Sequence, residues 1–295
     1  MSITNNKIIK TLEAGKLPLT KWMSNNEEVL THIEENKKLS AYIDEIKAVK
    51  TLGLMFYPGE DMFGYKIKEL EKIKFTKRGL LSVAASLYDP IGWMIPVIVK
   101  LRLLIQSLWV NELGWDDNID PITKQAFEKC LHNIKLLNEI KIPRWLHTTD
   151  NNIMELVGFC DASKVAYAAV IYSRILTKDG WAVTIIASKG RVTPLKTKKI
   201  IDLKLCTIPK LELEAILLLA ELYSQIIPCF NKSTKLISYT DSEVALAWVR
   251  SKKELQNKWI KNRVQKIKII IKPTDLHYVK SAENPADPAS RGLTP

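Results

Sequence analysis

The chain has 295 residues, of which 46% are hydrophobic and 26% charged, and this globular composition excludes a largely disordered chain and allows two or three domains. No run approaches the ~18 apolar residues of a membrane span, and the N-terminal segment lacks the apolar core of a signal peptide. The four cysteines are scattered, without a Cys-x-x-Cys pair, which argues against zinc or a disulfide framework and favours a reducing compartment.

The net charge of +12 is unevenly distributed along the chain. Residues 151–295 hold 23 Lys and Arg against 13 Asp and Glu, whereas residues 1–150 hold 21 against 19. A surplus confined to one half indicates a polyanionic partner for that half. A lysine-rich solubilising surface would give the same charge, so charge alone leaves both interpretations open.

The first half of the sequence predicts a hairpin followed by three helices. In residues 50–67, a turn at Pro58 lies between two runs of aliphatic and aromatic residues, which is typical of a β-hairpin. Apolar residues at helical spacing then predict one helix up to Tyr88, a second over residues 96–113 and a third over residues 121–138. We expect these helices to form a compact helical region.

The second half predicts a mixed α/β domain. Its first three strands follow one another closely and are expected to form an antiparallel meander, and a long helix over residues 209–227 leads to the fourth strand. A second helix is expected over residues 254–268. The predicted strands cover residues 156–160, 165–173, 181–188, 235–239 and 268–279.

Four acidic residues stand at the ends of these elements. Asp161 ends the first strand, Asp241 ends the fourth, Glu212 lies in the first turn of the long helix, and Asp287 begins the last helix. If the first and fourth strands are neighbours, their acids meet, and a helix packed on the sheet adds Glu212. Carboxylates gathered in one pocket repel each other unless a divalent cation compensates their charge. Each acid alone has the simpler interpretation of a turn residue, a cap or a solvated charge, but the four together favour a metal site.

Glu214 competes with Glu212 for the position in this site. Two residues along a helix are rotated by about 200°, so only one of the two side chains can face the other acids. Glu212 flanks the apolar side of the helix, which is expected to face the sheet. We therefore assign Glu212 to the site.

The chemistry of these ligands predicts a cofactor and a reaction. Hard oxygen ligands suit Mg²⁺ or Mn²⁺, and two such ions ~4 Å apart can activate a water and stabilise the leaving oxygen of a phosphodiester. The site therefore predicts a hydrolase that cuts phosphodiesters of nucleic acid with the help of metal ions. Basic residues near the site are expected to bind that nucleic acid. The candidates are Lys189, Arg191, Lys196, Lys198, Lys199, Lys210, Lys258 and Lys261.

Several segments together resemble one family. VGFCDAS, IPKLELEA, SYTDSEVALAW and ENPADPASRG follow one another as in the ribonuclease H-like domain of BEL/Pao-type retrotransposon polyproteins. TKRGLLSVAASLYDPIGWMIP, LWVNELGWDD and IPRW are similar to the segment before that domain, which is often labelled Pao retrotransposon peptidase. LPLTKWMSN and KTLGLMFYPGEDMFGYKI resemble the end of a reverse transcriptase palm, in which the hairpin corresponds to a primer grip.

The resemblance implies three regions and an activity for a fragment of such a polyprotein. Residues 1–75 correspond to the end of the palm, residues 76–150 to a helical connection, and residues 151–295 to a ribonuclease H-like domain with a five-stranded sheet and flanking helices. In that family the positions of the four acids bind two Mg²⁺ ions, and the RNA strand of an RNA/DNA hybrid is cut. The expected partners are the hybrid and the other polyprotein segments, reverse transcriptase and integrase. The expected location is the cytoplasm, virus-like particles or the nucleus, without a membrane partner.

The chain also departs from the family's pattern. Cellular members have a mobile loop with a histidine before the last acid, where this chain has Lys280-Ser281-Ala282, and His277 lies earlier. The last helix is short, which predicts that Asp287 is held loosely. The sequence contains neither a Tyr-x-Asp-Asp motif nor an Asp-Thr/Ser-Gly triplet, so polymerase activity and aspartic proteolysis have no visible basis. The main alternative is an inactive, decayed or domesticated nucleic-acid-binding module.

Overall fold

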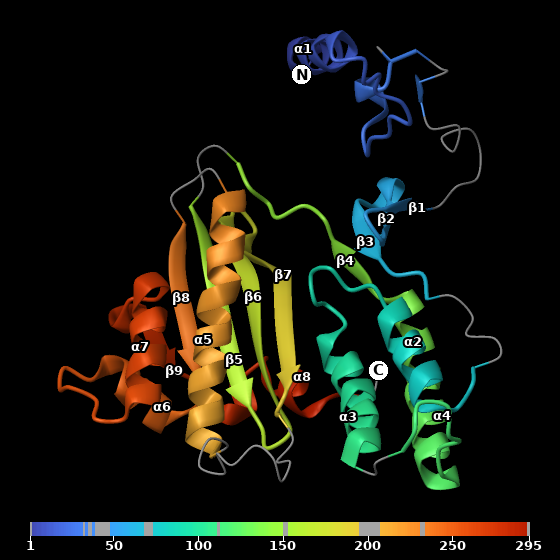
Figure 1. Ribbon diagram of the computed structural model, residues 1–295. Helices are drawn as coiled ribbons and strands as arrows, with labels where there is room; N and C mark the ends of the chain where they lie inside the picture. Colours follow the sequence, from blue (N-terminus) through green and yellow to red (C-terminus); the bar gives the residue numbers. More distant parts are fainter. Residues whose placement is uncertain are drawn as a thin grey trace. The chain divides into compact units, whose positions relative to one another are not determined.

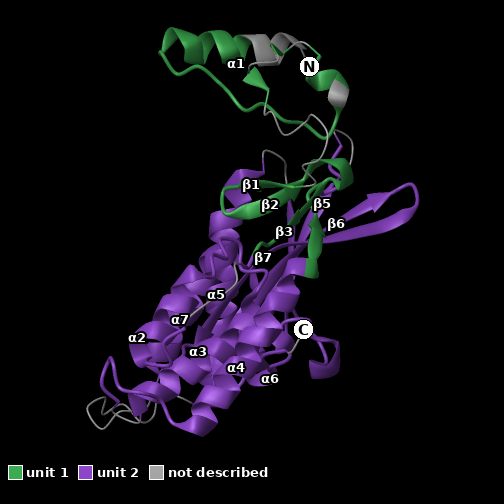
Figure 2. Cartoon of the chain, turned by 90° about the vertical axis from the view of Figure 1, so that its right-hand side faces the viewer, with its two compact units in different colours: residues 1–66, 139–145 green, residues 67–138, 146–295 purple. Residues whose placement is uncertain are grey.

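The computed structural model describes residues 2–31, 33–34, 37–38, 48–67, 73–110, 113–149, 153–194, 207–230 and 234–293. The chain divides into two compact units (Figure 2), residues 1–66 with 139–145 and residues 67–138 with 146–295. The second unit therefore combines the helical region with the α/β sheet. The division into three regions with boundaries after residues 75 and 150 stays a prediction.

The first unit contains a helix and a small antiparallel sheet. Its helix, α1, covers Ser2–Ala14. The strands β2 (Leu54–Tyr57) and β3 (Met62–Gly64) pair antiparallel across a short turn, which confirms the predicted hairpin. The outer strands β1 (Val49–Thr51) and β4 (Lys141–Pro143) complete the sheet in the order β1-β2-β3-β4.

The second unit begins with three helices, which lie where the sequence predicts them (Figure 1). They are α2 (Lys77–Ser86), α3 (Ile95–Val110) and α4 (Pro121–Lys135). The Thr76 side chain accepts a hydrogen bond from the first turn of α2, and the Asp120 side chain does the same for α4. These caps satisfy N–H groups that a helix leaves unpaired at its start, so they determine where both helices begin.

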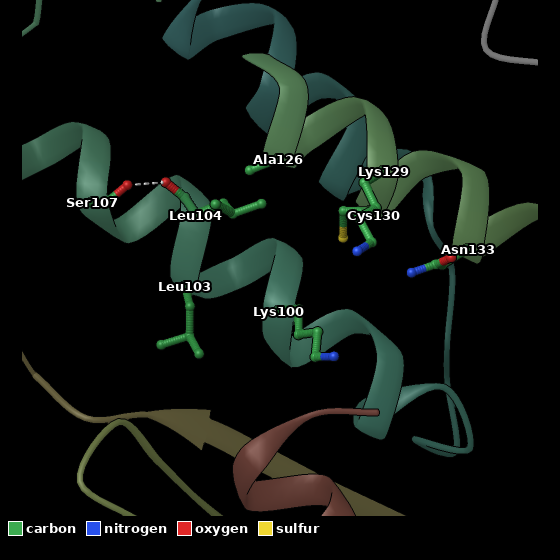
Figure 3. Close-up of a pocket in the computed structure, with 8 residues that line it drawn as sticks. All are labelled: Lys100, Leu103, Leu104, Ser107, Ala126, Lys129, Cys130 and Asn133. Carbon is green, nitrogen blue, oxygen red and sulfur yellow. Dashed lines mark hydrogen bonds between the residues drawn. The ribbon is translucent and has the colours of Figure 1, made fainter. Parts of the chain in front are cut away.

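A cavity of about 460 Å³ lies between α3 and α4 (Figure 3). Cys130 of α4 lines it, and burial raises the pKa of the Cys130 thiol to about 11. The other lining residues are Lys100, Leu103, Leu104, Ser107, Ala126, Lys129 and Asn133.

A five-stranded mixed sheet forms the centre of the second unit, in the order β7-β6-β5-β8-β9. The first three strands form the predicted antiparallel meander, and β8 and β9 continue the sheet in parallel with β5. The strands are β5 (Met154–Ala162), β6 (Ala166–Thr177), β7 (Gly180–Val192), β8 (Lys235–Thr240) and β9 (Leu276–Tyr278).

The long helix α5 (Ile208–Ile226) packs on one face of this sheet, as Figure 1 shows. Gly158 of β5 permits the close approach, because a Cβ atom there would lie 2.5 Å from the Tyr223 hydroxyl oxygen. That hydroxyl donates a hydrogen bond to the Ile237 carbonyl oxygen at 2.9 Å, so the buried phenol is satisfied. Two further helices, α6 (Glu243–Arg250) and α7 (Lys258–Ile270), pack beside α5.

The opposite face of the sheet is covered by α3 and by the last helix, α8 (Asp287–Arg291). Alternate residues of β6 point to opposite faces. Ala169 therefore belongs to the core shared with α5, whereas Ala168 packs against Ile95 of α3 and Ala289 of α8. The helical region thus supplies one layer of the α/β unit.

Side chains and backbone from the same region also cover the edge strand β7. The Ser188 N–H donates to the Ile91 carbonyl oxygen at 2.8 Å. Arg102 and Gln106 of α3 donate to carbonyl oxygens near the end of β7, at 3.0 and 2.7 Å. Because an uncovered edge leaves backbone groups free to pair with another chain, these contacts protect the sheet.

The predicted fifth strand, residues 268–279, is wrong in its extent. α7 continues to Ile270, and only the three residues of β9 pair with β8. Ile260, Val264 and Ile267 are buried at helical spacing, so packing of this face overrides the strand preference of the β-branched run that follows.

In the part of the chain that the structure describes, no helix is long and apolar enough to span a membrane.

Candidate functional site

Two neighbouring parallel strands bring the first pair of acids together. β5 and β8 pair in parallel, with Cys160 opposite Thr240. Asp161 and Asp241 are the next residues along the two strands, so both carboxylates emerge at the same edge of the sheet. The condition under which these two acids were expected to meet, that the first and fourth strands are neighbours, is therefore fulfilled.

Helix α5 contributes the third acid. Glu212 lies in its first turns with 6% of its surface exposed, and it belongs to the group formed with the two aspartates. Glu214 points elsewhere and forms an ion pair with Arg263 of α7 at 2.5 Å. The helical rotation of about 200° therefore separates the two glutamates as expected.

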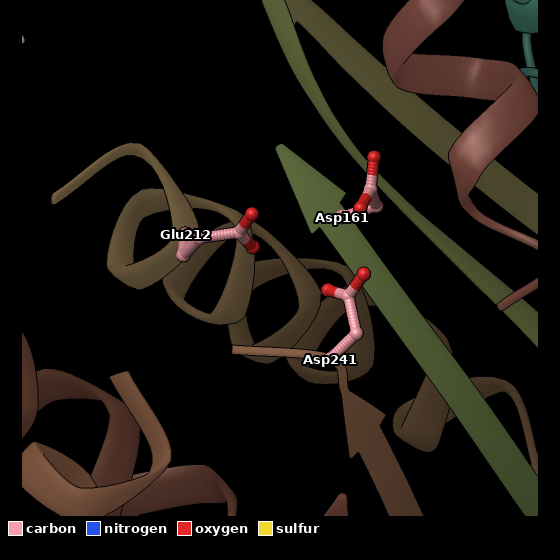
Figure 4. A group of neighbouring side chains, drawn as sticks. All are labelled: Asp161, Glu212 and Asp241. Carbon is pink, nitrogen blue, oxygen red and sulfur yellow. The ribbon is translucent and has the colours of Figure 1, made fainter. Parts of the chain in front are cut away.

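The three acids converge closely (Figure 4). One carboxylate oxygen from each of Asp161, Glu212 and Asp241 lies within 4.8 Å of the others. They share a cavity of about 660 Å³ with Lys164 and Arg291, among other residues. Oxygens bound to one Mg²⁺ lie no more than about 4.2 Å apart, so a small movement of these side chains would let all three contact one cation.

Two serines each bind one oxygen of an aspartate. The buried Ser290 hydroxyl donates to Asp161 Oδ2, and the Ser281 hydroxyl donates to Asp241 Oδ2 at 2.6 Å. Asp241 Oδ1 and Glu212 Oε2 are buried and have no hydrogen-bond partner among the described residues. Such buried oxygens are costly unless a ligand satisfies them.

The electrostatics of the acids favour a cation between them. Burial raises the pKa of Glu212 to about 8, and the charges of Asp161 and Asp241 add to this effect. Burial likewise raises the pKa of Asp161 to about 6, against the hydrogen bond from Ser290. A divalent cation would relieve both the burial cost and the mutual repulsion of these carboxylates. The donor set, all oxygen and partly unsatisfied, fits Mg²⁺ or Mn²⁺.

Asp287, the fourth predicted acid, lies outside this close group of described residues. It is the first residue of α8, and its Oδ1 accepts a hydrogen bond from Arg291 Nε one helical turn later. Its charge is nevertheless near enough to raise the pKa of Asp161. The structure thus brings three of the four predicted acids together and pairs the fourth with an arginine.

The short helix α8 is firmly packed, whereas the expectation that it holds Asp287 loosely as a ligand stays a prediction. Ser290 is fully buried and Ala289 is 3% exposed. The Ser163 hydroxyl donates to the Ser290 carbonyl oxygen at 2.9 Å, and the Leu293 N–H donates to the Pro96 carbonyl oxygen at 2.8 Å. The sheet and the α3 segment therefore hold α8 from both sides.

The predicted nucleic-acid-binding residues are spread over β7, α5 and α7. Lys189 is half-buried, Lys258 is exposed, and Lys210 lies 5.3 Å from the ring centre of Trp259. Ion pairs join Arg191 to Glu221 and Lys261 to Glu254. Lys196, Lys198 and Lys199 lie outside the described residues.

Sequence reasoning missed Ser281, Ser290 and Arg291, which surround the acids. Ser290 and Arg291 directly follow the last predicted acid in ENPADPASRG, so position within that motif was an available signal. For Ser281 the only signal was its place in the loop before that motif.

The sheet order and the acids at the ends of two parallel strands define a ribonuclease H-like fold. The chain belongs to the family described as Pao retrotransposon-like RNaseH-like domain, whose model matches residues 76–242. This match begins at the cap of α2, so it includes α3 and α5, which pack on opposite faces of the sheet, but it ends before α8. The chain thus contains a ribonuclease H-like domain of a retrotransposon family.

Several solved structures are similar to the chain. A ribonuclease H1 from the archaeon Halobacterium salinarum is 12% identical, with 45% of this chain and 89% of that chain covered and a TM-score of 0.29. LC11-RNase H1 from compost, in complex with an RNA/DNA hybrid, is 14% identical, with 45% and 91% covered and a TM-score of 0.30. A foamy viral protease-reverse transcriptase in complex with dsDNA is 16% identical, with 85% and 47% covered and a TM-score of 0.28. No curated protein matches the chain.

Proposed function

We propose that the chain is a metal-dependent endoribonuclease of the ribonuclease H type, which cuts the RNA strand of RNA/DNA hybrids as part of a retrotransposon polyprotein. The observation that carries the proposal is the pair of buried oxygens, Glu212 Oε2 and Asp241 Oδ1, which lie beside Asp161 and have no hydrogen-bond partner in the part of the chain that the structure describes. A structural acid cluster would have its oxygens satisfied by the protein.

Asp161, Glu212 and Asp241 would hold one Mg²⁺ or Mn²⁺ ion, and Asp287 would contribute to a second. Bound divalent ions supply an activated water and charge stabilisation for the leaving oxygen of a phosphodiester. The serine hydroxyls on Asp161 and Asp241 each occupy one carboxylate oxygen. This leaves the remaining oxygens oriented toward the cavity and reduces the rearrangement needed to receive a cation.

The nucleic acid would be attracted by basic side chains around the cavity. Lys164 and Arg291 line it, and both are exposed. Exposed Lys258 and half-buried Lys189 add positive charge on α7 and β7. Such residues neutralise phosphates without reading bases, which suits cleavage that does not depend on sequence. The other polyprotein segments, reverse transcriptase and integrase, are the proposed protein partners.

The test is cleavage of a labelled RNA/DNA hybrid in Mg²⁺ by the wild type and by Asp161→Asn. The substitution keeps the shape but removes a ligand charge, so we expect at least a ~100-fold loss of rate, corresponding to about 3 kcal/mol of transition-state stabilisation. Glu214→Gln is the matched control, since that residue pairs with Arg263 outside the acid group, and it should retain cleavage.

Three results would contradict the proposal in different ways. Equal cleavage by the wild type and Asp161→Asn would place the activity elsewhere. Tight hybrid binding without any cleavage by the wild type would identify a binding module instead. Equal cleavage of a DNA duplex or of single-stranded RNA would remove the assignment to hybrids.

A further inference from the structure

The Asp287–Arg291 ion pair stands at the edge of the acid site. Arg291 Nε donates to Asp287 Oδ1, and the two side chains are 62% and 32% exposed. Arg291 also lines the cavity shared by Asp161, Glu212 and Asp241. The guanidinium therefore binds the acid assigned to the second ion while facing the acids assigned to the first.

The electrostatic contacts of Arg291 extend beyond its direct partner. Asp287 contributes most to raising the pKa of Arg291, and the charges of Asp161 and Asp241 contribute as well. Conversely, the positive charge of Arg291 opposes in part the rise that burial causes in the pKa of Asp161 and of Glu212. Arg291 thus acts on the whole acid group as a permanently charged monovalent cation.

We propose that Arg291 is a built-in counter-cation that competes with a second divalent ion for Asp287 and so sets the affinity of that ion. The inference rests on the proposed function, because it takes Asp287 as a ligand of the second ion. Binding of that ion would place a divalent charge beside the guanidinium, and an ion that contacts Oδ1 would also displace the guanidinium from that oxygen. The protein would then hold one ion tightly and the second weakly.

The packing around α8 makes this exchange a movement of one side chain. Ser290 and Ala289 are buried, so the helix backbone is held in place. The Arg291 side chain, by contrast, is largely exposed, so its guanidinium can move away from Asp287 into solvent. An exposed pair of this kind contributes little to stability, and salt screens it. It can therefore be exchanged without unfolding the helix.

A purely structural role for the pair makes a different prediction. An Asp and an Arg four residues apart can simply stabilise a short helix. In that case removing the arginine would lower stability slightly and leave metal affinity unchanged. Metal binding, measured apart from catalysis, separates the two roles.

The experiment is a calorimetric titration of Mn²⁺ into the full chain, with manganese electron paramagnetic resonance as a second readout of bound ion. Arg291→Gln and Arg291→Met remove the charge, and the methionine keeps an aliphatic stem. We expect the dissociation constant of the weaker ion to fall about three- to tenfold in both, since a charge at these separations is worth about that factor. Arg291→Lys keeps the charge and should stay close to the wild type.

Two controls define the origin of the effect. Arg78→Gln removes a similarly exposed arginine of α2, which pairs with Asp116 outside the cavity, and it should leave Mn²⁺ binding unchanged. Asp287→Asn should weaken or abolish binding of the weaker Mn²⁺ ion. In the double variant with Arg291→Gln, Mn²⁺ affinity should differ little from that of Asp287→Asn alone. Circular dichroism melts verify that each variant is folded.

The outcomes separate this inference from the proposed function. If the wild type binds Mn²⁺ and cleaves the hybrid but Arg291→Gln and Arg291→Met bind within twofold of it, the counter-cation role is refuted and the nuclease assignment stands. A folded wild type that neither binds Mn²⁺ nor cleaves refutes both.

Discussion

Replacing Glu212 by glutamine should make the metal-free protein more stable at alkaline pH. Burial and two neighbouring aspartates raise the pKa of Glu212 from 4.5 to about 8. The folded state therefore holds a proton on Glu212 at pH values at which the unfolded chain has lost it. Stability must then fall as pH rises from about 4.5 to about 8, because the folded state binds more protons than the unfolded state. Glutamine resembles the protonated acid and removes this loss.

The expected size of the effect follows from the two pKa values. At about 1.4 kcal/mol for each pH unit, the interval from pH 5.5 to about 8 is worth about 3 kcal/mol. This is a large part of the 5–15 kcal/mol by which a typical domain is stable. The free energy of unfolding of Glu212→Gln minus that of the wild type should therefore be about 3 kcal/mol larger at pH 9 than at pH 5.5.

The assay is urea unfolding in EDTA at both pH values, followed by fluorescence and circular dichroism. Subtracting the free energy of unfolding of the wild type from that of the variant at each pH cancels the contribution of all other titrating groups. Glu214→Gln is the matched control on the same helix. It breaks the ion pair with Arg263, so it should lose about 1–3 kcal/mol at both pH values. Adding Mg²⁺ at pH 9 should stabilise the wild type more than Glu212→Gln.

A wild type and a Glu212→Gln variant with parallel stability profiles from pH 5.5 to pH 9 would refute this reasoning. That result would mean that the Glu212 carboxylate ionises in the folded state as readily as in water. An opposite sign, with the variant losing stability at pH 9, would indicate that the ionised form has a stabilising partner.

Two further predictions concern the rest of the second unit. Burial raises the pKa of the Cys130 thiol to about 11, whereas Cys229 is exposed. Thiol labelling of the native protein at pH 8, mapped by mass spectrometry, should therefore modify Cys229 at least ~100-fold faster than Cys130. Comparable rates would mean that α4 opens readily. Gly92→Ala should lower the free energy of unfolding by more than about 2 kcal/mol, because φ is +80° there and the new Cβ would lie 1.7 Å from the Ser188 carbonyl oxygen. An unchanged urea midpoint would show that the segment before α3 does not need to contact β7.

The convergence of three acids could be predicted because it depends on local rules. Asp161 and Asp241 each follow an apolar strand, and neighbouring parallel strands end at one edge of a sheet. Glu212 could be chosen over Glu214 because a helix rotates its side chains by a known angle. These rules act over a few residues, so they can be read from the sequence once the two strands are taken to be neighbours, and that pairing is a long-range contact.

The fifth strand shows where local rules end. The run after Ile267 is rich in isoleucine and favours a strand, yet α7 extends to Ile270. Its buried face packs beside α5, and that burial outweighs the intrinsic preference of a few residues. A contact between elements far apart in sequence decided the outcome.

The sequence by itself determined the element types, the meander, and the acids at the strand ends, because these follow from periodicity and strand ends, whereas the pairing of β5 with β8 that brings the acids together came from the tertiary structure. Only the tertiary structure decided the state of Asp287. The sheet and α3 bury Ser290 and so fix α8, which leaves Asp287 paired with Arg291 and Asp161 hydrogen-bonded to Ser290. The contact between Asp161 and Ser290 joins residues more than a hundred positions apart, and its geometry depends on how the layers pack.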